Sequence, residues 1–231
     1  MKKIKKYERQ HKEEIDDVFH QLNLGNVGNV IYWWKFFEMI ESIEGDVVEC
    51  GVGRGRSLIV ISALNYFLDK NEGGGRKIFA YDSFEGFPEP TDEDKSNRKP
   101  KKGEWSSSPT NKYKYSVDFT NQVLSDADIP INEMSFNIKK GYFCDSLIDH
   151  PDRPIALLHV DGDLYQSYKD VLENLYSRVS AGGIIVFDDF IADESENEDF
   201  PGARLAVEEF LGCKVKDLKI SVGGTNYLIK E

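Results

Sequence analysis

Short apolar runs that end in glycine or aspartate recur along the chain from Asp46 and alternate with stretches of helical periodicity. This alternation is typical of βαβ units, because a strand buried on both faces is apolar throughout, whereas its connecting helix repeats every three to four residues. The pattern predicts helices that include residues 57–68 and 166–179. It predicts five parallel strands, at residues 47–50, 77–81, 134–138, 155–160 and 183–187.

The end of the chain carries two further apolar runs, at residues 215–220 and 226–229. Gly223 and Gly224 lie between them, and a glycine pair between two short runs is typical of an antiparallel hairpin. The sequence therefore predicts an α/β fold with a doubly wound sheet, mainly parallel, that ends in an antiparallel C-terminal hairpin at one edge.

Residues 7–45 have helical periodicity. Glycines and asparagines at residues 25–29 are expected to interrupt the helix, and an aromatic cluster follows at residues 32–37. Most of these aromatics are expected to pack between helices, and the alternative is a lid that lines a substrate pocket. We therefore predict a helical cap and substrate region over residues 1–45, ahead of the main domain at residues 46–231. The apolar side chains that set the early helical spacing are Ile15, Val18, Phe19 and Leu22.

Residues 88–116 fit neither pattern, since they contain four prolines, several lysines and a run of serines. A loop of this length inside a compact domain is usually either functional or disordered. Of these two alternatives, we expect a lid over the active site.

Composition and charge narrow the class of protein. The 231 residues fit one α/β domain, and no run approaches the roughly 20 apolar residues that a membrane helix needs. The basic N-terminus continues into charged residues instead of the apolar stretch of a signal peptide, and three scattered cysteines fit a reducing compartment. We therefore expect a cytoplasmic protein with no membrane partner. The net charge of −12 disfavours binding to nucleic acid.

A glycine-rich loop follows the first predicted strand. Its alternating glycines let the backbone approach a ligand closely where the next helix begins, and nicotinamide and flavin enzymes use such loops too. Two features favour S-adenosylmethionine: the spacing departs from G-x-G-x-x-G, and the Glu49 carboxylate suits a cationic amino group better than a pyrophosphate. The alternative is a turn without a ligand. The predicted cofactor-binding residues are Glu49, Gly51, Val52, Gly53, Gly55 and Ser57.

The second and third predicted strands add polar residues at their ends. Asp82, with Ser83 beside it, follows the second strand, where an acid in nucleotide sites accepts hydrogen bonds from ribose hydroxyls. Because S-adenosylmethionine and NAD both carry that ribose, Asp82 selects a class of cofactors only. Asp145 and Ser146 follow the third strand, and by analogy with the fold we expect them near the adenine.

Aspartates crowd the ends of the fourth and fifth predicted strands. Asp161 and Asp163 follow the fourth strand, and Asp188 and Asp189 follow the fifth. Because neighbouring strand ends meet at the ligand-binding edge of such a sheet, these carboxylates would repel one another and raise one another's pKa values. A hard cation such as Mg²⁺, Ca²⁺ or Mn²⁺ removes that penalty, so we expect a metal site in preference to a surface acid patch. An NAD-dependent oxidoreductase, the other class with such a glycine loop, has no need of this cluster.

Five short motifs lie at or near these predicted strand ends. They are Glu49-Cys50-Gly51-Val52, Asp82-Ser83-Phe84-Glu85-Gly86-Phe87-Pro88, Gly141-Tyr142-Phe143, Asp161-Gly162-Asp163-Leu164-Tyr165 and Asp188-Asp189. Together they resemble the macrocin O-methyltransferase family, whose members methylate sugar hydroxyls on macrolide and aminocoumarin antibiotics. The resemblance covers residues 46–189. The chain departs from the family at Gly53, where a bulky aromatic is usual, and at Arg56, where a small residue is usual.

The resemblance implies a Rossmann-like methyltransferase fold with S-adenosylmethionine as the methyl donor. It implies Mg²⁺ held by Asp161, Asp188 and Asp189, with Asp161 also acting as the general base. It implies a homodimer as well, which exposed aromatics near the N-terminus would support. The expected acceptor is a hydroxyl of a sugar-bearing small molecule in natural-product or polysaccharide biosynthesis.

The base and the acceptor each have an alternative. Asp163 and His159 are the other candidates for the base, although His159 lies inside a strand and is expected to be a packed core histidine. Catechol-type methyltransferases place a lysine base where Leu164 stands here, which favours a sugar-type acceptor over an aromatic, catechol-like one.

Overall fold

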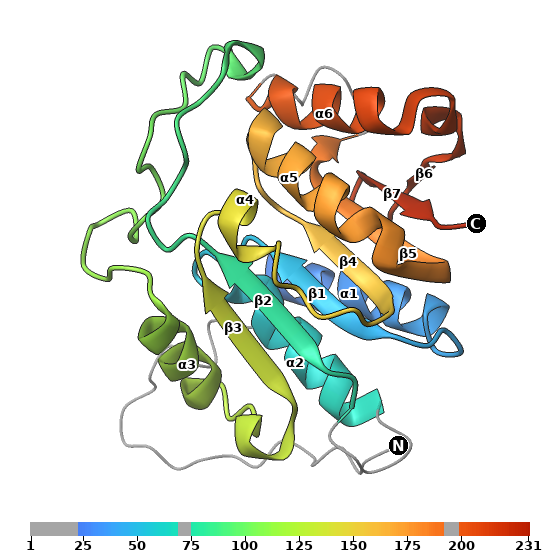
Figure 1. Ribbon diagram of the computed structural model, residues 1–231. Coiled ribbons are helices and arrows are strands. Elements are labelled where there is room, and N and C mark those ends of the chain that lie inside the picture. The colour runs from blue at the N-terminus through green and yellow to red at the C-terminus, as the bar shows by residue number, and fades with distance from the viewer. Residues whose placement is uncertain (1–22, 69–74, 192–198) are drawn as a thin grey trace.

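A sheet of seven strands forms the centre of the protein in the part of the chain that the computed structural model describes, residues 23–68, 75–191 and 199–231. Its order is β3-β2-β1-β4-β5-β7-β6, and β7 runs antiparallel to both β5 and β6 (Figure 1). The other neighbouring pairs are parallel, so the predicted fold class is confirmed. The strands are β1 (Asp46–Cys50), β2 (Ile78–Asp82), β3 (Phe136–Lys140), β4 (Ile155–Val160), β5 (Val179–Ile191), β6 (Lys219–Ile220) and β7 (Thr225–Ile229).

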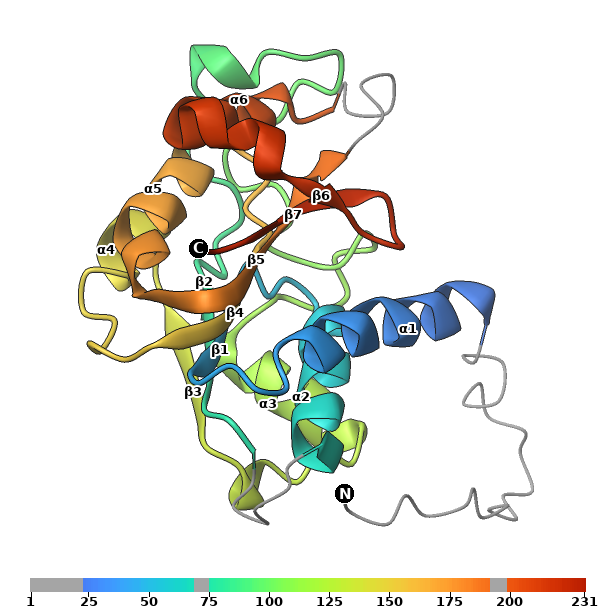
Figure 2. The same ribbon diagram turned by 90° about the vertical axis from the view of Figure 1, so that its right-hand side faces the viewer.

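Helices cover both faces of the sheet, as Figure 2 shows with the sheet seen nearly edge-on. Each layer of helices buries its own hydrophobic cluster against the strands, which accounts for the continuous apolar runs of β1 and β4. Within the described ranges, every helix falls short of the length and apolarity that crossing a membrane requires. One face carries α4 (Phe143–Ser146), α5 (Tyr165–Leu175) and α6 (Pro201–Leu211), and the other carries α1 (Leu24–Met39), α2 (Arg56–Leu68) and α3 (Val117–Asp126).

Helix α1 passes through both glycines that we expected to interrupt it. It begins after Asn23, whose side chain accepts the backbone N–H of Asn26, and continues to Met39. A glycine inside a helix costs about 1 kcal/mol, which the burial of four large aromatics further along the helix outweighs. These aromatics, Tyr32, Trp33, Phe36 and Phe37, pack inside the molecule as predicted. The helical periodicity predicted before residue 23 lies outside the described residues.

Several predicted boundaries were wrong. The strand predicted at residues 183–187 extends over β5, residues 179–191, so Asp188 and Asp189 lie within it and do not follow it. The helix predicted to reach residue 179 ends at Leu175, because Val179 is buried and already pairs with Ile155 at the start of β5. Residues 134–138 shift to 136–140, since a 3₁₀ turn ends just before Met134. Residues 215–217 belong to a 3₁₀ helix that begins at Gly212, which leaves only β6 in the edge hairpin.

Residues 88–116 cross the carboxyl ends of the strands with little regular structure. They contain a 3₁₀ turn at Asp92–Asp94 and an isolated bridge between Ser107 and Lys114. The Asp94 carboxylate accepts the backbone N–H of Tyr165, the first residue of α5, and so fastens this segment to the main body. That the segment acts as a lid remains a prediction.

The Arg76 side chain ties the end of α1 to the start of the sheet. Its guanidinium donates to the backbone oxygens of Ile40 at 2.8 Å and Gly45 at 2.7 Å. Arg76→Met keeps the aliphatic stem but leaves both oxygens without this donor, so we expect the free energy of unfolding to fall by about 2 to 3 kcal/mol. Chemical denaturation measures the change. Lys35→Met, which removes an exposed ion pair to Glu38, should change stability by less than about 0.5 kcal/mol.

Candidate functional site

A pocket of about 750 Å³ opens at the carboxyl edge of the sheet, where the predicted site residues gather. Pockets of this size hold small molecules and cofactors. Its walls come from the glycine loop, the ends of β2, β4 and β5, the start of α5 and the segment 88–116. The predicted site residues that line it are Gly51, Val52, Gly53, Ser57, Asp82, Ser83, Asp161, Asp188 and Asp189. The predicted Gly55 does not line it, although its neighbours Arg54 and Arg56 do.

The glycine loop depends on glycine at Gly51. A Cβ atom there would lie 1.7 Å from the backbone oxygen of Asp161, and its φ of +106° disfavours other residues. The backbone N–H of Asp161 in turn donates to the oxygen of Cys50 at 2.9 Å. The end of β1 and the first aspartate of the acid cluster are therefore held in direct backbone contact.

Asp82 fastens the glycine loop from the end of β2. Its Oδ2 accepts the backbone N–H groups of Val52 at 2.9 Å and Gly53 at 2.8 Å, and its Oδ1 accepts that of Phe84 at 2.6 Å. Ser83 caps the following turn by donating to the oxygen of Gly86. Both residues line the pocket, so the Asp82 carboxylate holds the glycine loop in shape and also faces the space where a ligand can bind.

The acid cluster forms two overlapping groups around Asp161. One joins Asp161 to His159 and Asp188, and the other joins it to Asp163 and Asp189. In each group one candidate ligand atom per residue lies within 4.8 Å of the others. The three aspartates expected to hold a metal are thus neighbours, but they divide between the two groups.

Hydrogen bonds hold Asp189 in its own group. Its Oδ2 accepts the backbone N–H of Asp163 at 2.9 Å, and the Tyr168 hydroxyl lies at the same distance. That hydroxyl also accepts the backbone N–H of Asp189. Asp188 points the other way, with 44% of its side chain exposed.

Burial and mutual repulsion shift the titration of these carboxylates. Burial raises the pKa of Asp161, and the charges of Asp188 and Asp189 raise it further. Burial, followed by the charge of Asp189, likewise raises the pKa of Asp163. Burial and the charge of Asp188 raise the pKa of Asp189 to about 7. The cluster therefore favours any ligand that brings positive charge to it.

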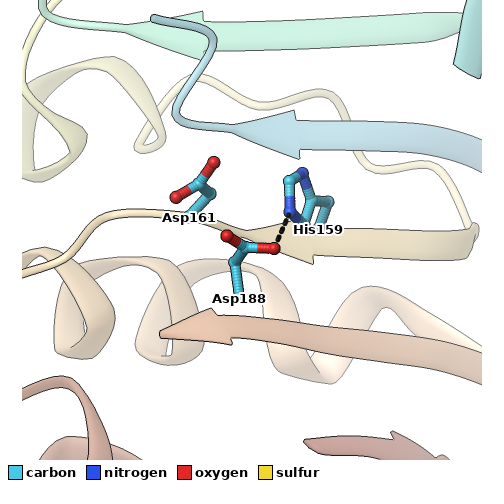
Figure 3. Close-up of side chains that lie close together, drawn as sticks. All are labelled: His159, Asp161 and Asp188. Carbon is cyan, nitrogen blue, oxygen red and sulfur yellow. Dashed lines mark ion pairs between the residues drawn. The ribbon is translucent and has the colours of Figure 1, made fainter. Parts of the chain in front are cut away.

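Glu49 lies beneath the pocket and not on its wall. Its carboxylate is buried, and Oε1 lies 3.3 Å from Nδ1 of His159 on the neighbouring strand. On the opposite side of the ring, Nε2 lies 3.6 Å from Oδ1 of Asp188, as Figure 3 shows. His159 is buried in the core, as predicted. The sequence did not predict that its ring lies between the carboxylates of Glu49 and Asp188. The expectation that Glu49 contacts the cofactor gains no support from this placement.

The loop after β3 contributes different residues from those predicted. Asp145 is exposed and Ser146 is buried, where its hydroxyl donates to the oxygen of Gly141. Neither lines the pocket. The short helix α4 turns them away, and the residues of this loop that do line the pocket are Tyr142, Phe143 and Cys144.

An aromatic wall, which the sequence did not reveal, closes the pocket opposite the glycine loop. Phe87, Trp105 and Phe200 line the pocket around the guanidinium of Arg98, which lies 4.8 to 5.5 Å from their ring centroids. Glu104 binds Arg98 at 2.7 Å and holds it in place. Phe200 lies far along the sequence from the others, so the wall could not be read from one segment, and the signal that the sequence offered was Trp105 within a polar, proline-rich segment.

Comparison with known proteins identifies the family. Residues 37–211 match the macrocin-O-methyltransferase (TylF) family, and this range covers the glycine loop and the whole acid cluster. The chain belongs to the macrocin-O-methyltransferase family. Membership confirms the resemblance drawn from the five motifs and extends it on both sides, into α1 and through α6.

Relatives within the macrocin-O-methyltransferase family include enzymes named for antibiotic substrates. The chain is 31% identical over 168 residues to 8-demethyl-8-(2,3-dimethoxy-alpha-L-rhamnosyl)-tetracenomycin-C 4'-O-methyltransferase of Streptomyces olivaceus, covering 67% of this chain and 56% of that protein. It is 30% identical over 178 residues to demethyldecarbamoylnovobiocin O-methyltransferase of Streptomyces niveus, covering 73% and 59%. The chain thus spans less than two thirds of the length of these curated relatives.

Solved structures share the fold of this family member. The O-methyltransferase NovP superposes with a TM-score of 0.64 at 25% identity, covering 85% of this chain and 78% of NovP. The calicheamicin methyltransferase CalS11 gives a TM-score of 0.75 at 23% identity, covering 93% and 83%. The likeness to CalS11 concerns the fold alone.

The raised pKa of Asp189 predicts how stability depends on pH in the metal-free protein. A carboxyl whose pKa is higher in the folded state holds its proton more tightly there, so the free energy of unfolding falls as pH rises from about 4 to about 7. Asp189→Asn keeps an acceptor for Tyr168 and the Asp163 amide but removes this charge. Denaturation in a chelator should show a smaller loss of stability across that pH range in the variant.

The matched control is Asp149→Asn, which changes a side chain that is 81% exposed and lies outside the cluster. It should keep the wild-type dependence on pH. Identical slopes for wild type and Asp189→Asn would contradict the account of a strained acid cluster.

Proposed function

We propose that the protein is an S-adenosylmethionine-dependent O-methyltransferase that uses Mg²⁺ and acts on a hydroxyl of a sugar-bearing small molecule. The observation that carries the proposal is that the glycine loop and the acid cluster line one pocket. Cofactor loops of this kind serve several classes of enzyme, but buried carboxylates beside the loop suit a reaction that must remove a proton from an acceptor.

The residues present fit S-adenosylmethionine. Gly51 leaves no room for a side chain, and the space around the Cα of Gly53 is open, so the backbone can lie against a ligand. Asp82 lies where a ribose hydroxyl can donate to it. When bound, S-adenosylmethionine supplies a methyl group on a positively charged sulfur, which a nucleophilic oxygen can displace.

The residues present also fit a divalent cation. Asp161, Asp188 and Asp189 would hold it, because burial and repulsion already raise the pKa values of Asp161 and Asp189 and a cation relieves that cost. When bound, Mg²⁺ lowers the pKa of a hydroxyl that lies against it.

Asp161 is the proposed base. It lies at the centre of both groups of the cluster and on the pocket wall, where an acceptor hydroxyl can reach it. Asp163 is the alternative, but it is only 7% exposed and sits in a left-handed turn with φ of +58°. His159 is fully buried beneath the pocket and is not among the lining residues, which removes it as a base that touches the acceptor.

The aromatic wall supports a sugar-type acceptor. The rings of Phe87, Trp105 and Phe200 offer an apolar surface on which one face of a sugar ring can pack, while its hydroxyls point to the acid cluster. Leu164, where catechol-type enzymes have their lysine, is buried at 1% exposure and offers no base. Of the relatives named above, the tetracenomycin enzyme is named for a rhamnosyl-bearing substrate, in keeping with this class of acceptor.

A homodimer is part of the proposal. The aromatics of α1 that were expected to mark the interface are buried within the chain and do not support it. A different row of residues on α1 supports an interface between two copies, because its apolar side chains are exposed. The row consists of Leu24, Val27, Val30 and Ile31.

The segment 88–116 is proposed as the lid over the pocket, since Trp105 and Pro109 line it.

The proposal is tested by the formation of S-adenosylhomocysteine with a panel of nucleotide-linked sugars and glycosylated antibiotic precursors. We expect turnover with at least one sugar acceptor, its loss in a chelator and its return with Mg²⁺. Asp161→Asn should lower kcat by about 100-fold or more while S-adenosylmethionine still binds, because the variant lacks the base.

The control is Asp152→Asn, at the opposite end of β4 with its side chain fully exposed, which should keep wild-type turnover. Near-normal kcat in Asp161→Asn with Mg²⁺ present would rule out Asp161 as the base. Turnover only with catechols would overturn the proposed class of acceptor.

A further inference from the structure

The imidazole of His159 presents an unsatisfied nitrogen to the acid cluster. The side chain is 0% exposed, and its Nε2 has no hydrogen-bond partner among the described residues. The nearest carboxylate oxygen, Oδ1 of Asp188, lies 3.6 Å away, which is beyond hydrogen-bonding distance. A buried polar atom without a partner loses the hydrogen bonds that it would make with water, so the position calls for a ligand that satisfies it.

The other ring nitrogen has a partner that fixes the orientation of the ring. Nδ1 lies 3.3 Å from Oε1 of the buried Glu49, which can accept the Nδ1 proton, and in that tautomer a bound cation would take the lone pair of Nε2. Trp33 packs edge-on against the ring, with centroids 4.7 Å apart and planes at 79°. A carboxylate behind a histidine is the arrangement that orients histidine ligands of metals in proteins.

The spacing of the atoms fits one cation. Ligands about 2.1 Å from an octahedral ion lie roughly 3 Å apart when adjacent and roughly 4 Å apart when opposite. The 3.6 Å between Nε2 of His159 and Oδ1 of Asp188 lies between these two spacings, so a shift of about half an ångström brings both atoms onto one ion, and both groups offer atoms within 4.8 Å of Asp161. The view in Figure 3 shows the three side chains, from the ends of β4 and β5, turned toward one small volume.

We infer that Nε2 of His159 is a further ligand of the cation, in addition to the carboxylates proposed above and nearest to Asp161 and Asp188, and that Glu49 orients it. The inference rests on the proposed function, since it concerns the cation of the same site. It gives Glu49 a role in place of the cofactor contact expected from the sequence. It also changes the expected cation, because an imidazole donor favours Mn²⁺ and later transition metals over Mg²⁺ and Ca²⁺.

Mn²⁺ is the probe that tests this ligand set in the full-length protein stripped of metal. Electron spin echo modulation of bound Mn²⁺ should show coupling to a directly bound nitrogen, and labelling histidine with ¹⁵N should change that coupling. Calorimetry should give tighter binding of Mn²⁺ than of Mg²⁺ by about 10-fold or more. In His159→Gln the nitrogen coupling should vanish and the preference for Mn²⁺ should fall.

Two further variants separate the roles. Glu49→Gln should keep the nitrogen coupling but weaken Mn²⁺ binding about 10-fold, as expected for a residue that orients a ligand. His150→Gln is the control, because His150 is also a buried histidine with an unpartnered Nε2, yet its Nδ1 faces the Tyr81 hydroxyl and it lies outside the cluster. It should leave both the coupling and the affinity unchanged.

The outcomes distinguish this inference from the proposed function. Mn²⁺ that binds the wild type without coupling to histidine nitrogen overturns the inference alone and leaves a site of oxygen ligands. A wild type that binds no divalent cation overturns both the inference and the metal part of the proposal. The spectrum of the wild type decides the question even if His159→Gln fails to fold.

Discussion

The repulsion among carboxylates at the ends of β4 and β5 is the constraint around which the site is arranged. The parallel pairing of the two strands, with Val160 opposite Phe187, brings the residues just after this pair, Asp161 and Asp188, to the same edge of the sheet. Asp163 becomes buried there and Asp161 and Asp189 half-buried, although taking a charged carboxylate out of water is costly. The protein offsets part of this cost with hydrogen bonds from Tyr168 and the backbone, and the remainder favours positive charge in the pocket.

The same edge explains why one pocket can hold a cofactor, a cation and an acceptor. The sheet reverses its strand order between β1 and β4, and Gly51 allows the two strand ends to approach until their backbones touch. The strand order therefore places the glycine loop next to the acid cluster. Asp82, at the end of β2, holds the loop by accepting its backbone N–H groups. Trp105 of the segment 88–116 joins Phe87 and Phe200 in the aromatic wall, which gives the remaining space a shape suited to the proposed acceptor.

The sequence predicted what depends on local pattern. Strand β4 was predicted to the residue, because a fully buried strand is apolar throughout, and the clustering of the aspartates followed from the shared edge of parallel strands. It could not predict the contact between Glu49 and His159, which depends on the register of β1 against β4. Nor could it predict that α1 continues through Gly25 and Gly28, since packing at a distance outweighs a local preference.

The most direct test of the central claim is calorimetric titration of S-adenosylmethionine, and then Mg²⁺, into wild type and an Asp188→Ala, Asp189→Ala double variant. The account predicts that S-adenosylmethionine binds both proteins and that Mg²⁺ binds only the wild type. A wild type that binds the cofactor but no metal would contradict the role given to the acid cluster. A wild type that does not bind S-adenosylmethionine would contradict the proposed function as a whole.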